Sequence, residues 1–150
     1  MKQNKYDDNA FFRKYSQMDR SVKGLEGAGE WKTLERLLPD FRDRHVLDLG
    51  CGFGWHCRYA AEHGAASVLG VDISAKMIAK ARSMGNEGII EYRCMPMEDI
   101  LLPEASFDIV LSSLAFHYTP DFQAVCRNVS RWLKPEGAFI FSVEHPVFTA

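Results

Sequence analysis

The stretch that decides the fold is His45-Val46-Leu47-Asp48-Leu49-Gly50-Cys51-Gly52-Phe53-Gly54. A short apolar run ends there in a G-x-G-x-G turn, and residues 55–63 then resume a helical pattern. A strand that passes through a glycine turn into a helix is typical of a βαβ unit, in which the next strand lies parallel to the first. The stretch therefore predicts the start of a parallel sheet.

Further strands and helices alternate along the rest of the chain. The predicted strands are 67–71, 89–93, 107–112 and 138–143, and the predicted helices are 74–84, with Ser74 as N-cap, and 121–133. The strands are almost continuously apolar, which is typical of a sheet covered on both faces. We expect an α/β fold with a doubly wound, mainly parallel sheet, and ligands at the carboxyl ends of its strands.

The segment before the first strand has a different pattern. Aromatic residues spaced by three to four in residues 1–22 predict short amphipathic helices, and residues 21–29 read as a glycine-rich loop. A further helix is expected over residues 30–38, ended by Pro39. We expect one compact domain with a helical cover over residues 1–40 and a ligand-binding core over residues 41–150.

Composition excludes several classes of protein. The 150 residues suit one domain, 47% are apolar, and 18 lysines and arginines against 20 acids give a net charge of −2, which argues against a nucleic-acid-coating surface. The four cysteines form no C-x-x-C pair, and no metal site is predicted. Without a signal-peptide region or a run of about 18 apolar residues, we expect a cytoplasmic protein with reduced thiols and no membrane partner.

The glycine turn favours one class of cofactor. A dinucleotide fingerprint needs G-x-G-x-x-G, but its third glycine position, counted from Gly50, is Trp55. Asp48 stands two residues before the first glycine, where a pyrophosphate would be repelled. A carboxylate there suits a ligand with a cationic end, such as the amino group and sulfonium of S-adenosylmethionine.

Val46 to Gly54 resembles the glycine motif of class I S-adenosylmethionine-dependent methyltransferases. The likeness extends from about Tyr6 to Ala150 and is strongest to small-molecule methyltransferases whose domain resembles the ubiquinone and sterol biosynthesis enzymes. It implies a Rossmann-like fold, S-adenosylmethionine as cofactor, S-adenosylhomocysteine as product, and a small-molecule methyl acceptor rather than nucleic acid.

The resemblance also implies a set of cofactor-binding residues: Asp48, Gly50, Cys51, Gly52, Gly54, Asp72, Ile73, Met77, Met97, Glu98 and Leu114. Asp72 ends the second strand and would accept both ribose hydroxyls; the alternative is an N-cap for the next helix. Ile73 and Met77 would lie beside the adenine, or belong to the core. Pro96 stands where family members commonly carry an adenine-binding Asp, so that contact would rest on the Met97 amide and Glu98.

The candidate catalytic residue is His117, which follows the fourth strand and would act as a general base; the alternative is a loop histidine bonded to a backbone carbonyl. The candidate substrate-binding residues are Tyr15, Arg20, Trp31, Glu144 and His145. The first three resemble positions of the family's N-terminal cover, and the alternative is a helix that merely packs on the sheet. Glu144 and His145 follow the fifth strand at the same rim.

The expected reaction is an in-line methyl transfer, which needs alignment of the two reactants and exclusion of water rather than a catalytic triad or a metal. Three alternatives remain beside an active small-molecule methyltransferase. A non-catalytic module that binds S-adenosylmethionine or S-adenosylhomocysteine would share the motifs. Trp55 and Asp48 disfavour a nicotinamide dehydrogenase. A nucleic-acid methyltransferase is disfavoured by the net charge and by Ser112-Ser113-Leu114-Ala115 where amino-group DNA enzymes carry Asn/Asp-Pro-Pro-aromatic.

Members of the family usually continue after the fifth strand with a helix and an antiparallel hairpin, and the chain ends at Ala150. We therefore expect a sheet without that hairpin, from a fragment, a natural truncation, or a chain whose partner supplies the cover. Residues 139–143 would then leave an apolar edge open, which predicts a homodimer through this edge.

Overall fold

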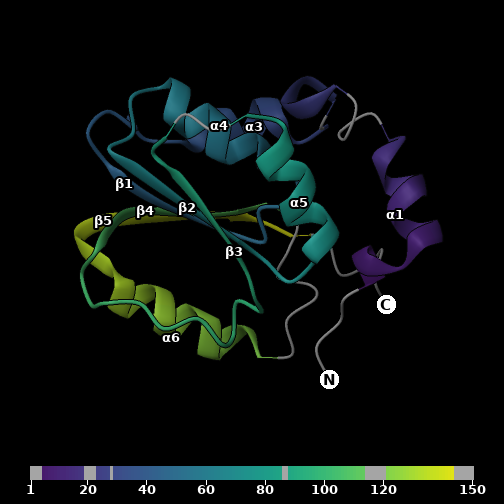
Figure 1. The fold of residues 1–150 in the computed structure, drawn as a ribbon. Coiled ribbons are helices and arrows are strands. Elements are labelled where there is room, and N and C mark those ends of the chain that lie inside the picture. Colours follow the sequence, from purple (N-terminus) through teal and green to yellow (C-terminus); the bar gives the residue numbers. More distant parts are fainter. Residues whose placement is uncertain (1–4, 19–22, 28, 86–87, 114–120, 144–150) are drawn as a thin grey trace.

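The computed structural model describes residues 5–18, 23–27, 29–85, 88–113 and 121–143, and these form a five-stranded sheet (Figure 1). The strand order is β3-β2-β1-β4-β5, and the four neighbouring pairs are parallel. The strands are β1 (His45–Leu49), β2 (Ser67–Asp72), β3 (Ile90–Cys94), β4 (Phe107–Ser113) and β5 (Leu133–Ser142). The order reverses between β1 and β4, which places a topological switch point at the end of β1.

Helices cover both faces of this sheet. Figure 1 shows α3, α4 and α5 on one face and α6 on the other. The helices are η1 (Lys5–Asp7), α1 (Asn9–Ser16), η2 (Gly24–Gly27), α3 (Trp31–Leu37), α4 (Trp55–Glu62), α5 (Ala75–Ser83) and α6 (Phe122–Trp132). The predicted doubly wound, mainly parallel α/β architecture is confirmed, and the described strands include no antiparallel pair.

The core forms two layers because successive strand residues point to opposite faces. On β1, Val46 belongs to the layer under α4 and α5, while Leu47 belongs to the layer with α6. The link between β3 and β4 contributes to the second layer through Ile100, which is 2% exposed. With both faces covered, each central strand reads as continuously apolar, as the sequence pattern indicated.

Side-chain caps begin the helices where the sequence predicts them. The Ser74 hydroxyl accepts a hydrogen bond from the Met77 amide at 3.1 Å, which confirms the predicted N-cap of α5. Asp121 caps α6 in the same way, through a 3.0 Å bond from the Ala124 amide. None of the described helices combines the length and the apolarity that crossing a bilayer requires.

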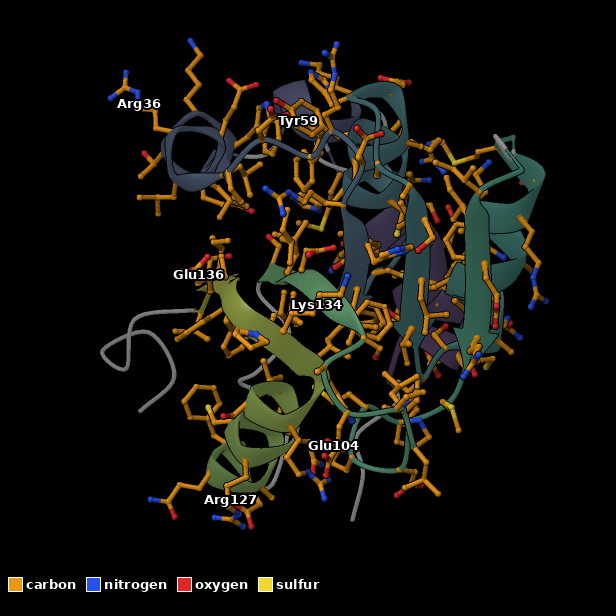
Figure 2. All side chains as sticks on the ribbon, turned by 90° about the vertical axis from the view of Figure 1, so that its left-hand side faces the viewer. Arg36, Tyr59, Glu104, Arg127, Lys134 and Glu136 are labelled. Atoms are coloured by element: carbon orange, nitrogen blue, oxygen red, sulfur yellow. The ribbon has the colours of Figure 1, made fainter. Side chains whose placement is uncertain are left out.

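The start of the fifth strand differs from the prediction. The sequence places it at residue 138, because Pro135-Glu136-Gly137 reads as a helix stop, but β5 already begins at Leu133 (Figure 2). Opposite this start the register shifts, so that Phe107 pairs with Leu133 and Ile109 pairs with Ala138. The extra residues form a bulge at the sheet edge, where a proline without an N–H and the positive φ of Glu136 are tolerated.

Candidate cofactor site

The glycine turn lies at the carboxyl end of β1, at the switch point of the sheet. Gly52 and Gly54 both have positive φ, 55° and 79°. A Cβ on Gly54 would lie 2.4 Å from the Tyr92 hydroxyl, whereas a Cβ on Gly52 would meet nothing within 4 Å. The turn is therefore closed on its Gly54 side by Tyr92 and open above Gly52, where a ligand can approach the backbone.

Asp72, at the end of β2, fixes this turn to the neighbouring strand. Its carboxylate accepts two backbone hydrogen bonds, from the Gly52 amide at 2.8 Å and from the Ser74 amide at 2.9 Å. Burial raises the pKa of Asp72, the two backbone bonds oppose that rise, and the nearby Asp7 carboxylate adds to it. Asp72 therefore links the glycine turn to the start of α5, and its role in ribose binding stays a prediction.

Asp48 lies behind the turn and is 1% exposed. Its carboxylate accepts a 3.4 Å hydrogen bond from the Cys57 thiol of α4. Burial raises the pKa of Asp48 to about 7, the thiol bond opposes the rise, and the charge of Asp72 adds to it. The sequence places this carboxylate against a cationic ligand, but strand alternation turns it toward α4. Asp48 therefore does not line the pocket, and its part in cofactor binding stays a prediction.

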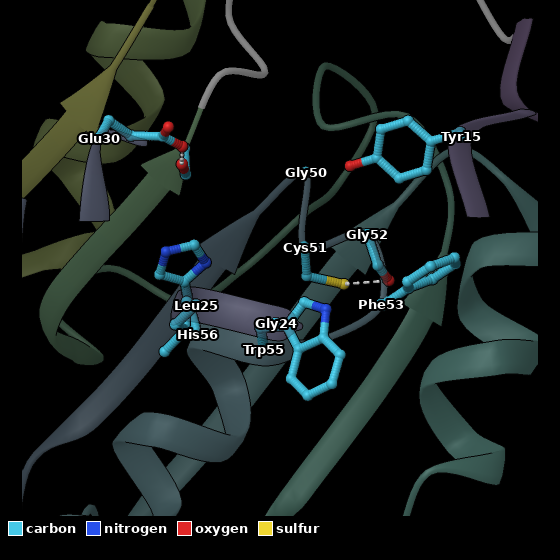
Figure 3. A pocket seen from close by; sticks show the side chains of 11 residues that line it. Tyr15, Gly24, Leu25, Glu30, Gly50, Cys51, Gly52, Phe53, Trp55 and His56 are labelled. Atoms are coloured by element: carbon cyan, nitrogen blue, oxygen red, sulfur yellow. Dashed lines mark hydrogen bonds between the residues drawn. The ribbon is translucent and has the colours of Figure 1, made fainter. Parts of the chain in front are cut away.

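A pocket opens over the turn, with about 490 Å³ of empty space including its open mouth (Figure 3). Its lining residues are Tyr15, Gly24, Leu25, Glu30, Gly50, Cys51, Gly52, Phe53, Trp55, His56 and Ser113. The glycine turn lies in its centre, and the N-terminal segment and the end of β4 supply walls. Segments far apart in the sequence thus enclose one site.

Polar side chains gather at one end of the pocket. Figure 3 shows Glu30 and His56 on the same side of the glycine turn. The Ser113 hydroxyl at the end of β4 donates a 3.5 Å hydrogen bond to Glu30 Oε1, and the Ser142 hydroxyl lies 3.3 Å from that of Ser113. This end joins the start of α3 to the ends of β4 and β5.

Aromatic side chains form the other end of the pocket. The ring of Phe53, within the glycine turn, meets the rings of Phe12 and Tyr15 of α1 edge-on, with centroids 6.0 and 5.9 Å apart. Asp7 of η1 holds the same segment on α5, because its carboxylate accepts hydrogen bonds from the Ser74 hydroxyl at 2.5 Å and the Lys76 amide at 3.1 Å. The N-terminal segment therefore covers the turn.

The structure brings some predicted site residues together and separates others. Gly50, Cys51, Gly52 and Tyr15 line the pocket. Met77 is 2% exposed in the core. Four further predicted site residues lie outside the lining. Gly54 is the N-cap of α4, Ile73 follows Asp72, and the half-buried Met97 and Glu98 follow β3.

Trp31 packs within the cover and does not line the pocket. It is 5% exposed, and its ring meets those of His56 and Tyr59 edge-on, at centroid distances of 5.5 and 4.8 Å. Its place corresponds to the alternative of a helix packed on the core. Five predicted residues lie outside those the structure describes: Arg20, Leu114, His117, Glu144 and His145.

Sequence reasoning missed most of the pocket walls, which are Gly24, Leu25, Glu30, Phe53, Trp55, His56 and Ser113. One signal was present. Glu30 is the first residue of the predicted helix and the N-cap of the observed α3, a position that favours Ser, Thr, Asp or Asn. A residue type that caps poorly in that position indicates a different role for its side chain.

Comparisons with known proteins agree with this geometry. Residues 47–141 match the family described as a methyltransferase domain. The chain is 48% identical to an S-adenosylmethionine-dependent methyltransferase from Mesorhizobium loti, with a TM-score of 0.81 over 85% of this chain and 58% of that one. It is 33% identical to a ubiquinone biosynthesis O-methyltransferase of Neisseria meningitidis over 95% of this chain and 65% of that protein. A Haemophilus influenzae protein is 37% identical over 96% of this chain and 59% of its own length.

The chain thus spans about three fifths of the length of the curated relatives it matches. The family match covers well over half of the chain and includes the glycine turn, Asp72 and the end of β4. The chain therefore belongs to the methyltransferase-domain family, and the predicted resemblance to class I S-adenosylmethionine-dependent methyltransferases is confirmed.

Proposed function

We propose that this chain binds S-adenosylmethionine over its glycine turn and, within the whole protein, transfers the methyl group to a small molecule by in-line displacement. One observation carries the proposal. Nothing lies within 4 Å of a Cβ placed on Gly52, while the Gly52 amide donates a 2.8 Å hydrogen bond to the Asp72 carboxylate. An open turn beside a carboxylate at the switch point fits a nucleoside with free ribose hydroxyls.

The residues around the turn fit the parts of this cofactor. Asp72 would accept the ribose hydroxyls, and Gly50, Cys51, Gly52 and Gly54 would lie along the methionine part. Ile73, Met77, Met97 and Glu98 would lie around the adenine, and Leu114 would border the methionine part, in the manner that the family resemblance implies. Asp48 would add negative charge behind the turn without contact.

The cofactor supplies a methyl group that its sulfonium already activates. The protein's task is then to orient the acceptor and to exclude water. Tyr15 and Phe53 close one end of the pocket with apolar ring surface. His117 would take a proton from an acceptor that loses one, and Arg20, Glu144 and His145 would join Tyr15 in the proposed substrate-binding set.

The relatives support a small-molecule acceptor rather than a nucleic acid. The Neisseria relative is named for O-methylation in ubiquinone biosynthesis, and the net charge of −2 does not favour a polyanion. The alternative of a non-catalytic cofactor-binding module predicts binding without methyl consumption. We further propose that the chain self-associates through the edge of β5.

Calorimetric titration with S-adenosylhomocysteine tests the proposed cofactor. We expect micromolar binding, and a loss of at least about tenfold in Asp72→Ala, because charged hydrogen bonds contribute about 1.5–3 kcal/mol each. Asp40→Ala is the matched control, since that exposed carboxylate bonds the Arg42 amide away from the pocket. Binding of NADH in place of S-adenosylhomocysteine, or no binding to a folded chain, would contradict the proposal.

A further inference from the structure

Arg58 of α4 is a buried cation to which no carboxylate of the described residues is paired. We propose that Arg58 and Tyr92 bind a small inorganic anion, phosphate or chloride, between α4 and β3. This site is separate from the proposed cofactor site, because neither Arg58 nor Tyr92 lines the pocket over the glycine turn.

The Arg58 guanidinium has only weak partners, although the residue is 9% exposed. Its Nη2 donates to the thioether sulfur of Met84 at 3.8 Å, which is a weak acceptor, and its Nη1 has no hydrogen-bond partner. The guanidinium carbon lies 4.5 Å from the centre of the Trp55 ring, which attracts the cation without neutralising its charge. A buried charge with such partners is unfavourable unless an anion compensates it.

The Tyr92 hydroxyl is a second buried group without a hydrogen-bond partner. It lies against the start of α4, 2.4 Å from a Cβ placed on Gly54, and the Gly54 carbonyl accepts a 3.0 Å hydrogen bond from the Arg58 amide. Burial raises the pKa of Tyr92, and the charge of Arg58 opposes that rise. The phenol therefore keeps its proton at neutral pH and can donate a hydrogen bond beside the first turn of α4.

The chemistry of these groups favours an anion over a water molecule. A guanidinium can only donate hydrogen bonds, and the protonated phenol can donate one as well. The indole Nε1 of Trp55, whose ring lies under the guanidinium, is a further buried donor without a partner. A water molecule could accept from these groups but would leave the Arg58 charge uncompensated. A phosphate or chloride ion accepts several hydrogen bonds and also supplies the negative charge.

Thermal unfolding at constant ionic strength tests the site. Sodium phosphate in one series, and sodium chloride in another, replaces sodium gluconate, whose anion is too large for an enclosed site. We expect the Tm to rise along a saturating curve with at least one of the two ions, by roughly 5 °C at tenfold excess over the midpoint concentration. Tyr92→Phe removes only the hydroxyl and should raise that midpoint about tenfold.

Arg58→Met separates a bound anion from a general effect of salt on stability. The variant keeps an apolar stem and removes the charge, so its Tm should follow no saturating curve with either ion. Salt effects on the whole surface would remain in this variant, because they do not require a particular residue. Arg127→Met is the matched control, since Arg127 is exposed on α6 and its loss should leave the wild-type curve unchanged.

Three results would overturn the proposal. They are a wild type without a saturating response to either ion, equal saturating responses in the wild type and Arg58→Met, and loss of the response in Arg127→Met as well. Circular dichroism checks that each variant folds. If Arg58→Met does not fold, Tyr92→Phe decides, because an unchanged midpoint in that variant would also contradict the site. None of these measurements depends on cofactor binding, so the proposed function stands or fails separately.

Discussion

Two carboxylates at the ends of neighbouring strands have different roles although the sequence presents them alike. The Asp72 carboxylate accepts hydrogen bonds from two backbone N–H groups, which are strong donors. The buried Asp48 carboxylate accepts a hydrogen bond from the Cys57 thiol, which is a weak donor. Burial therefore dominates at Asp48, and its pKa rises to about 7, whereas at Asp72 two backbone bonds oppose the rise.

The raised pKa of Asp48 predicts a stability that falls with rising pH. Its native pKa is about 7 against an ordinary value of 3.8, so the native state holds a proton that the unfolded state releases between these values. The stabilising contribution is complete below pH 3.8 and is lost as the pH rises toward 7. We expect the free energy of unfolding in urea to fall between pH 5 and 8 by on the order of 2 kcal/mol more in the wild type than in Asp48→Asn.

Asp48→Asn is a close isostere whose side-chain oxygen still accepts the Cys57 thiol. Asp72 remains in both proteins, so its own titration cancels from the comparison. Parallel pH profiles for the two proteins would show that Asp48 is ionised throughout this range, in contradiction to its enclosed position.

At the scale of elements, one side chain of the cover, Asp7, bonds several groups at the start of α5. Asp7 of η1 acts as a second cap of α5, since its carboxylate bonds the Ser74 hydroxyl and the Ala75 and Lys76 amides, at 2.5, 3.3 and 3.1 Å. The Lys76 ammonium in turn bonds the Asn9 side chain at the start of α1. The negative charge of Asp7 also suits the N-terminal end of α5.

Asp7→Ala should therefore release the cover more than it unfolds the core. We expect a loss of about 1 kcal/mol in stability, as for other caps, and faster cleavage by chymotrypsin after the aromatic residues of α1. Limited proteolysis followed by mass spectrometry measures the cleavage site and rate. Asp121→Ala removes the cap of α6 and is the control: it should cost similar stability without faster cleavage in α1. Equal cleavage of α1 in both variants would contradict the role of Asp7 in holding the cover on α5.

The elements that the sequence predicted are those that local chemistry determines. Apolar runs set β1 and β2, and Ser74 marked the start of α5 by its capping chemistry. The start of β5 was missed because Pro135 and Gly137 are helix stops that an edge bulge also tolerates. Glu30 and Ser113 were missed as partners because 83 residues separate them, and only the tertiary fold brings them together.

At the scale of the whole molecule, the sheet ends in an apolar edge. β5 hydrogen-bonds to β4, and among the described residues no strand lies on its other side. Phe141 on β5 and Phe122 on α6 are each 40% exposed, with ring centroids 5.6 Å apart, and Val143 is 45% exposed. An edge strand with exposed aromatic surface is a template for pairing with another chain.

This edge predicts a self-association that depends on concentration and on Phe141. We expect the average mass from light scattering to rise with protein concentration in the wild type and to stay near that of the monomer in Phe141→Lys, because a charge at an edge opposes strand pairing. Leu101→Lys is the control, since Leu101 is 88% exposed in the link between β3 and β4 and should leave the association unchanged. A wild-type chain that stays monomeric at every concentration would contradict pairing through β5. Equal loss of association in both variants would contradict it too, because added charge alone would then explain the effect.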